Sequence, residues 1–231
     1  MPRRRRHRLP LAELLGAVGA LGALALPACA PRGPVLRYPW IEDYTLTLEH
    51  ELLLVHVRSD EVLVGARFGF RSLDTQRDRV LTFPVPPPCS DAHGFSAWLA
   101  GPGLVPLPLA TWLGSPDLLP AGEARQTYEI DLPGRELEVH QGILLVSYAQ
   151  RCDRAFRYTL RTGAYWTGAI GRLDVVVDDP GGRVIGARVE GRGPGTQAGT
   201  STLWTFVEIE PAGGLELELR PSPVSWLKSG R

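Results

Sequence analysis

The feature that most constrains the fold is a succession of short segments in which apolar and polar residues alternate, with Gly- and Pro-rich turns between them. Alternation with period two is typical of a β-strand that buries one face. It predicts strands at residues 44–49, 51–57, 62–70, 79–84, 126–132, 135–140, 143–149, 155–161, 172–178, 183–190, 202–209 and 215–220. The predicted fold is all-β, an antiparallel β-sandwich of the immunoglobulin-like or a related type.

One region interrupts this pattern. Residues 84–124 contain the stretches PVPPPC, FSAWLAGPG and LPLATWLG, and we expect a long Pro-rich insert with short helical turns. The insert either caps one end of a single sandwich over residues 41–221 or separates two packed β units near residue 125. Residues 222–231 form a C-terminal tail.

The N-terminus predicts export. Arginines at positions 3–6 and 8 precede an apolar run that ends at Ala28. A transmembrane anchor is the alternative, but the uncharged part, from Leu14 to Ala28, has 15 residues, fewer than the roughly 20 that span a bilayer. We therefore interpret residues 1–28 as a signal peptide.

The run ends in Leu26-Pro27-Ala28-Cys29, which resembles the lipobox of bacterial lipoproteins. The resemblance implies a lipid on the Cys29 thiol, cleavage before this residue and acylation of the new N-terminus. It also implies a tether at residues 29–40 and a site in the bacterial cell envelope, at the outer membrane or facing the periplasm, because no Asp follows Cys29. An ordinary secretory signal is the alternative.

Cysteine number and charge agree with export. If Cys29 carries a lipid, Cys89 and Cys152 remain as a pair, which predicts a disulfide in an oxidising compartment rather than two free thiols. Residues 1–28 hold five of the 25 basic and one of the 25 acidic residues, leaving 20 against 24. A mildly acidic chain without a basic stripe argues against nucleic-acid binding.

The glycine-rich stretch RTGAYWTGAIG at residues 161–171 is not a phosphate loop. It lacks the Lys and Ser/Thr of a Walker motif, and a predicted strand rather than a helix follows it. The chain resembles an uncharacterised family of exported bacterial proteins, a domain of unknown function, in Tyr158 just before this stretch, in Thr162, Gly163, Trp166, Gly168 and Ile170 within it, and in the segments 44–70, 83–86 and 204–211. The resemblance implies an envelope-facing β-rich domain and assigns no catalytic residue.

Catalytic motifs are absent from the sequence: it contains neither GxSxG nor HExxH. His50 and His56 fall on one face of a strand, either as a metal pair or as ordinary packed side chains. Residues 178–182 lack the pattern of a calcium loop and predict a hairpin turn. An envelope hydrolase or metal-dependent enzyme would need a dispersed site built from residues such as His50, His56, Asp91 and His93.

We therefore expect a lipid-anchored binding or structural module without enzymatic activity, cofactor or metal. Its partners would be the membrane, through Cys29, and an unidentified protein or glycan. Phe95, Trp98 and Trp112 of the insert are the candidate partner surface, because loops on rigid scaffolds concentrate recognition residues. The alternative is that these aromatic side chains close one end of the core.

Overall fold

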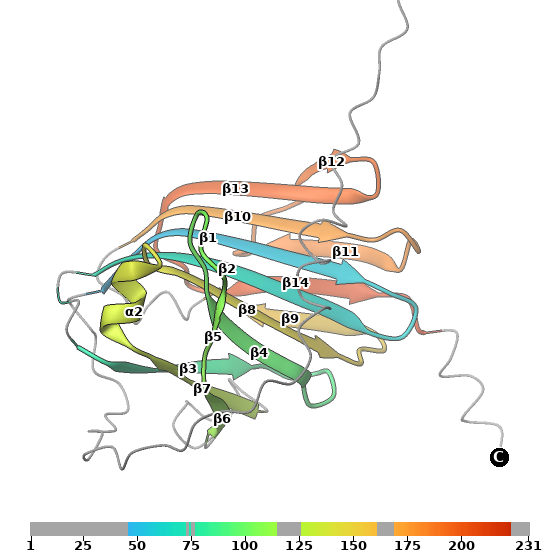
Figure 1. Cartoon of the computed structure of the whole chain (residues 1–231). Helices are drawn as coiled ribbons and strands as arrows, with labels where there is room; N and C mark the ends of the chain where they lie inside the picture. The colour runs from blue at the N-terminus through green and yellow to red at the C-terminus, as the bar shows by residue number, and fades with distance from the viewer. Residues whose placement is uncertain (1–45, 73, 75–76, 115–125, 161–168, 223–231) are drawn as a thin grey trace, which may run out of the picture. The chain divides into compact units, whose positions relative to one another are not determined.

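The computed structural model describes residues 46–72, 74, 77–114, 126–160 and 169–222 (Figure 1). The signal peptide, Cys29, most of the glycine-rich stretch and residues 115–125 lie outside this part. The described residues belong to one compact unit, Arg37–Arg231. None of the helices in the described part is long and apolar enough to cross a membrane.

The largest element is an eight-stranded sheet with the order β12-β13-β10-β1-β2-β8-β4-β5 (Figure 1). Its long strands are β1 (Leu46–Val57), β2 (Val62–Ser72), β8 (Ile143–Gln150), β10 (Ile170–Asp178) and β13 (Ser201–Ile209), and β4 (His93–Leu99), β5 (Leu107–Pro108) and β12 (Thr196–Ala198) complete it. The sheet is mixed, because β1 and β10 are parallel. The predicted antiparallel pairing thus holds for the other strand pairs of the described part but not for β1 and β10. After β8 the chain crosses to another sheet before it returns as β10, and such a crossover allows parallel pairing.

Two three-stranded sheets accompany the large one. One has the order β11-β14-β9, with strands Val184–Val189, Gly214–Leu219 and Ala155–Thr159; the other has the order β3-β7-β6, with strands Arg79–Val85, Gln126–Leu132 and Thr111–Gly114. All three sheets contribute to one buried core. The ring of Phe83 on β3 meets Phe68, Tyr148 and Tyr158 edge-on, at centroid distances of 6.5, 5.8 and 6.1 Å. This ring therefore links β3 to the large sheet and to β9.

Most predicted strands are confirmed, and the all-β class with them. The segments predicted at 44–49 and 51–57 form one strand, β1, with a register shift between Leu48 and His50. The strand predicted at 135–140 is wrong. Residues Gly134–Val139 form a short helix, α2, which follows Pro133 and buries Leu137, with a backbone bond from the amide of Leu137 to the carbonyl of Pro133.

The insert also differs from the prediction. Its described part contains the strands β4, β5 and β6 instead of helical turns. Ala97 and Leu99 are buried while Ser96 and Trp98, which alternate with them, are half-buried, so β4 has the ordinary alternation of a strand and pairs with β8. The prolines and glycines around β4 concealed this short pattern in the sequence.

The disulfide between Cys89 and Cys152 is present, with Cα atoms 4.7 Å apart. It joins the segment before β4 to the segment after β8. On the chain-entropy model a bridge that closes a loop of this length stabilises the fold by about 4 kcal/mol. The predicted pairing of the two cysteines is therefore confirmed.

The segment 178–182 is not the predicted hairpin turn, because β10 and β11 belong to different sheets. It is a connection between sheets, and the carboxylate of Asp179 accepts hydrogen bonds from the amides of Arg183 and Val184. The buried guanidinium of Arg183 then donates to the backbone carbonyls of Arg58, Cys152, Asp153 and Arg220. Arg183 thus fastens the β1–β2 turn, the disulfide segment and the end of β14 to one point.

Candidate functional site

The side of the eight-stranded sheet that faces away from the core, here called the outer face, carries His50 and His56, two of the ionisable side chains singled out in the sequence. Its residues alternate with buried ones along each strand. They are His50, Leu52, Leu54 and His56 of β1; Leu63, Gly65, Arg67 and Gly69 of β2; Ile143, Leu145, Ser147 and Ala149 of β8; Ser96 and Trp98 of β4; Arg172, Asp174, Val176 and Asp178 of β10; and Ser201, Leu203, Thr205 and Val207 of β13.

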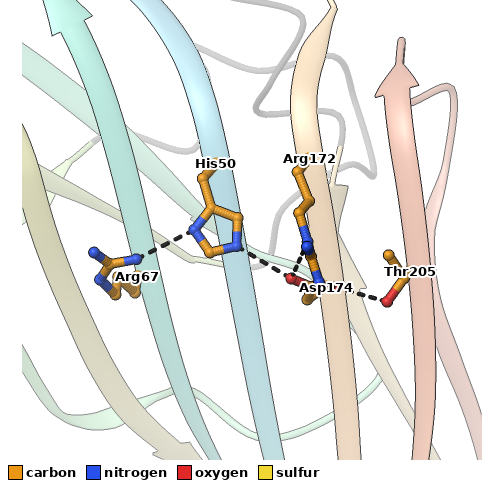
Figure 2. A network of polar contacts seen from close by, with 5 residues as sticks. All are labelled: His50, Arg67, Arg172, Asp174 and Thr205. Carbon is orange, nitrogen blue, oxygen red and sulfur yellow. Dashed lines mark hydrogen bonds and ion pairs between the residues drawn. The ribbon is translucent and has the colours of Figure 1, made fainter.

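A polar network crosses four strands at one end of the outer face (Figure 2). His50 Nε2 lies 3.2 Å from Asp174 Oδ2, and Arg67 Nη1 lies 3.2 Å from His50 Nδ1. Asp174 also accepts hydrogen bonds from Arg172, at 2.7 and 3.1 Å, and from the hydroxyl of Thr205 at 2.7 Å. Strand pairing alone brings these groups together, since each belongs to a different strand except Arg172 and Asp174.

The donors in this network fix which ring nitrogen of His50 donates a hydrogen bond and which accepts one. A guanidinium can only donate, so His50 Nδ1 must accept from Arg67, and Nε2–H must then donate to the carboxylate. Both ring nitrogens of the neutral imidazole are therefore engaged. Burial opposes the ionisation of Asp174, but the hydrogen bonds from Arg172, Thr205 and His50 outweigh it and lower the pKa of Asp174.

A second pair lies at the other end of the same face. His56 Nδ1 donates to Asp178 Oδ2 at 2.9 Å, and the hydroxyls of Thr200 and Ser201 donate to Asp178 Oδ1. Burial again opposes ionisation, while the bonds from Thr200, His56 and Ser201 lower the pKa of Asp178. In this pair the serine bonds the aspartate and not the histidine, which is not the order that activates a serine nucleophile.

The residues of the enzymatic alternative do not form one site. His56 follows His50 by six positions along an extended strand, a distance of about 20 Å. His93 lies against Glu61, with an Nε2–Oε2 distance of 3.5 Å, and Asp91 is exposed in the segment before β4. Within the described ranges, no group of three or more His, Cys, Asp or Glu side chains is arranged to hold a metal ion.

The three aromatic residues predicted as a partner surface are each half-buried and lie in different surroundings. The ring of Phe95 stacks on Tyr128 at 3.9 Å and packs against the core. Trp98 lies on the outer face beside Leu145, its partner on β8. Trp112 lies on β6, where its indole N–H donates to Glu129 at 2.7 Å. No single sheet face therefore presents all three.

A buried carboxyl lies on the opposite, core side of β1. Glu51 is fully buried, and Tyr158 Oη donates to its Oε1 at 3.4 Å. Among the described residues, Oε2 of Glu51 has no hydrogen-bond partner. Burial, reinforced by the negative charge of Glu190 and only partly offset by the bond from Tyr158, raises the pKa of Glu51 to about 8.

Sequence reasoning missed Glu51, although a signal was present. Leu53, Val55 and Val57 are buried on β1, and Glu51 has the same parity, so the alternation places its carboxyl inside. The partners of His50 carried no such signal. Asp174 is 124 positions away in the chain, and only the parallel register of β1 and β10 brings the two side chains together.

Comparisons with known proteins establish no family. No family model matches the chain, and no curated protein matches it. Similar solved structures include an M1 zinc metallopeptidase from Deinococcus radiodurans, which is 14% identical with a TM-score of 0.41 over 78% of this chain and 44% of that one. Native yeast LTA4 hydrolase is 10% identical with a TM-score of 0.41 over 91% of this chain and 33% of that one. The chain thus spans less than half the length of either, and TM-scores this low establish no shared fold or activity.

Proposed function

We propose that the protein is a lipid-anchored β-sandwich of the bacterial cell envelope that acts as a binding or structural module without enzymatic activity. The observation that carries the proposal is the sequence Leu26-Pro27-Ala28-Cys29 at the end of an apolar run with an arginine-rich start. The Cys89–Cys152 disulfide supports it, because such bridges persist in oxidising compartments such as the periplasm.

The chemistry of the outer face supports a module that binds rather than catalyses. His50 would have to break its bond with Arg67 or Asp174 before it could accept a proton from a substrate. The aspartates are likewise held as anions by several donors each. Such saturated networks orient side chains and rigidify a surface. The proposed partner is a protein or a glycan that contacts the insert at one or more of the half-buried residues Phe95, Trp98 and Trp112, which lie in different surroundings.

Mass spectrometry of the N-terminal peptide from the full chain made in a bacterial host tests the anchor. We expect a mature protein that begins at a lipid-modified Cys29 and fractionates with membranes. The matched control is Cys29→Ala, which leaves the Cys89–Cys152 pair unchanged and should not be lipidated. An unmodified N-terminus at another residue, or a Cys29→Ala protein that still fractionates with membranes, would contradict the proposal.

A further inference from the structure

The outer face is organised in four rows that run across the strands, each named here after its residue on β1. The His50 row contains Val207, Arg172, His50, Gly69 and Ile143, and the Leu52 row contains Thr205, Asp174, Leu52, Arg67, Leu145 and Trp98. The Leu54 row contains Leu203, Val176, Leu54, Gly65, Ser147 and Ser96, and the His56 row contains Ser201, Asp178, His56, Leu63, Ala149 and His93.

Large and small side chains are distributed unevenly over these rows. On β8 and β4 the Leu52 row has Leu145 and Trp98, whereas the Leu54 row has the small Ser147 and Ser96 at the same strands. The two serine hydroxyls lie 3.1 Å apart and bond each other. Packed sheets interlock when large side chains of one layer meet small ones of the other. The Leu52 row of one molecule thus fits the Leu54 row of a second.

Large residues likewise correspond to small ones on β2, and between the two outer rows, the His50 row and the His56 row. On β2, Arg67 in the Leu52 row corresponds to Gly65 in the Leu54 row, and Leu63 in the His56 row corresponds to Gly69 in the His50 row. On β8, Ile143 in the His50 row corresponds to Ala149 in the His56 row. A half-turn about an axis that runs along the rows, between the Leu52 and Leu54 rows, places each of these large residues opposite its small counterpart in the second molecule. On β1 it places Leu52 opposite Leu54 and His50 opposite His56.

Charged side chains of the His50 row and the His56 row are also complementary to each other. The His50 row carries the exposed guanidinium of Arg172, and the His56 row carries the carboxylate of Asp178, both on β10. Arg172 uses Nε and Nη2 to bond Asp174 in its own chain. The half-turn brings the cationic end of one face over the anionic end of the other, which is the arrangement that favours association.

The centre and the size of the face suit a stable interface. Leu52, Leu54 and Val176 are half-buried at its centre, and Leu203 is 39% exposed beside them. Six strands at about 4.8 Å and seven residues at about 3.3 Å cover roughly 650 Å² before side-chain relief is added. Stable complexes bury about 800 Å² on each partner.

We propose that the outer face is a homodimer interface, in which two copies pack face to face around a two-fold axis that runs across the strands between the Leu52 and Leu54 rows. A two-fold interface uses the same patch on both copies, so the patch must be complementary to itself. The size and charge relations between the rows supply that complementarity. Because packed sheets cross at about 30°, the residues of β1, β2 and β10 are opposed most directly.

Sedimentation equilibrium of the full chain in density-matched detergent tests the dimer. At about 10 µM, above the micromolar limit usual for interfaces of this size, we expect wild-type protein to be dimeric. Leu54→Arg should weaken the dimer at least about 100-fold, because the two-fold axis buries two unpaired charges. Ile185→Arg is the matched control: Ile185 is 52% exposed on β11, so its variant should remain dimeric. Leu203→Arg, at an exposed position of the face, should also dissociate the dimer if Leu54→Arg does not fold.

Charge reversal tests the orientation of the two copies. Arg172→Glu and Asp178→Arg should each weaken dimerisation about tenfold or more through like-charge contacts. The double variant restores opposite charges across the axis and should dimerise within about threefold of wild type. A double variant no tighter than the weaker single variant would overturn this orientation. A wild-type monomer at about 10 µM, including one whose outer face binds a glycan or another protein instead, would overturn the dimer.

Discussion

The buried carboxyl of Glu51 makes the stability of the fold depend on pH in a defined direction. Its pKa is raised to about 8 in the folded protein, from an ordinary value of 4.5. Between these two values the unfolded chain has released the proton and the folded protein has kept it. The free energy of unfolding therefore falls as the pH rises from about 4.5 to about 8 and changes no further above that range.

The magnitude follows from the same two values. Each pH unit in this range changes the free energy of unfolding by about 1.4 kcal/mol. The interval from 4.5 to about 8 then corresponds to at most about 5 kcal/mol, a large part of the 5–15 kcal/mol typical of a whole domain. Glu51→Gln keeps the size of the side chain and an acceptor for Tyr158 but cannot ionise, so it removes this dependence.

Urea unfolding followed by tryptophan fluorescence, at pH values between 5 and 9, measures the difference in the free energy of unfolding between Glu51→Gln and wild type. We expect the stability of Glu51→Gln relative to wild type to increase by about 4 kcal/mol from pH 5 to pH 8. Glu218→Gln, on the exposed face of β14, is the matched control. Its free energy of unfolding, plotted against pH, should run parallel to that of wild type. If the curves for Glu51→Gln and wild type also run parallel, Glu51 does not retain its proton and the reasoning is refuted.

Two further predictions concern the segments that meet at the disulfide. Arg183→Met should lower the free energy of unfolding by about 3–5 kcal/mol, because it leaves the carbonyls of Arg58, Cys152, Asp153 and Arg220 without their donor. The matched control is Arg188→Met, at an exposed position of β11, the strand that begins directly after Arg183; it should stay within about 0.5 kcal/mol of wild type in the same urea assay. Replacing both Cys89 and Cys152 with Ala should cost about 4 kcal/mol, and the cost should be non-additive with Arg183→Met, because Arg183 bonds the carbonyl of Cys152. Equal stability of Arg183→Met and Arg188→Met, or strict additivity with the disulfide variant, would contradict the role given to Arg183.

The sequence predicted the strands well because each long strand buries one face against the core. Period-two alternation is a local property, and it located β1, β2, β8, β10 and β13 to within a few residues. It failed where the pattern is short. The residues of α2 alternate over too few positions to distinguish a helical turn from a strand, and β4 is concealed among prolines and glycines.

Pairing between strands could not be predicted in the same way. The alternation placed His50 and His56 on one face, but Arg67, Asp174 and Asp178 become their neighbours only through the register of three strands. Register depends on the path of the chain between sheets, which the composition of the turns did not reveal: the segment after Asp178 resembled a hairpin turn and is instead a connection to another sheet. Local patterns therefore identify a face, and topology decides what that face contains.

The glycines of β2 show how the local sequence pattern and the strand topology combine. Gly65 and Gly69 lie in the interior of a long strand, where glycine weakens a sheet and leaves no side chain to pack. Neither has a positive φ, so no left-handed backbone conformation requires a glycine. A Cβ atom at Gly69, which pairs with His50 beside the register shift of β1, would lie 3.6 Å from His50, an ordinary van der Waals contact. A Cβ atom at Gly65 would meet only Leu54, at 4.0 Å, so packing within the chain does not require a glycine there either. In the proposed dimer both positions lie opposite large side chains of the second copy, Arg67 and Leu63. The self-complementary outer face thus accounts for two residues that the folded chain alone does not require.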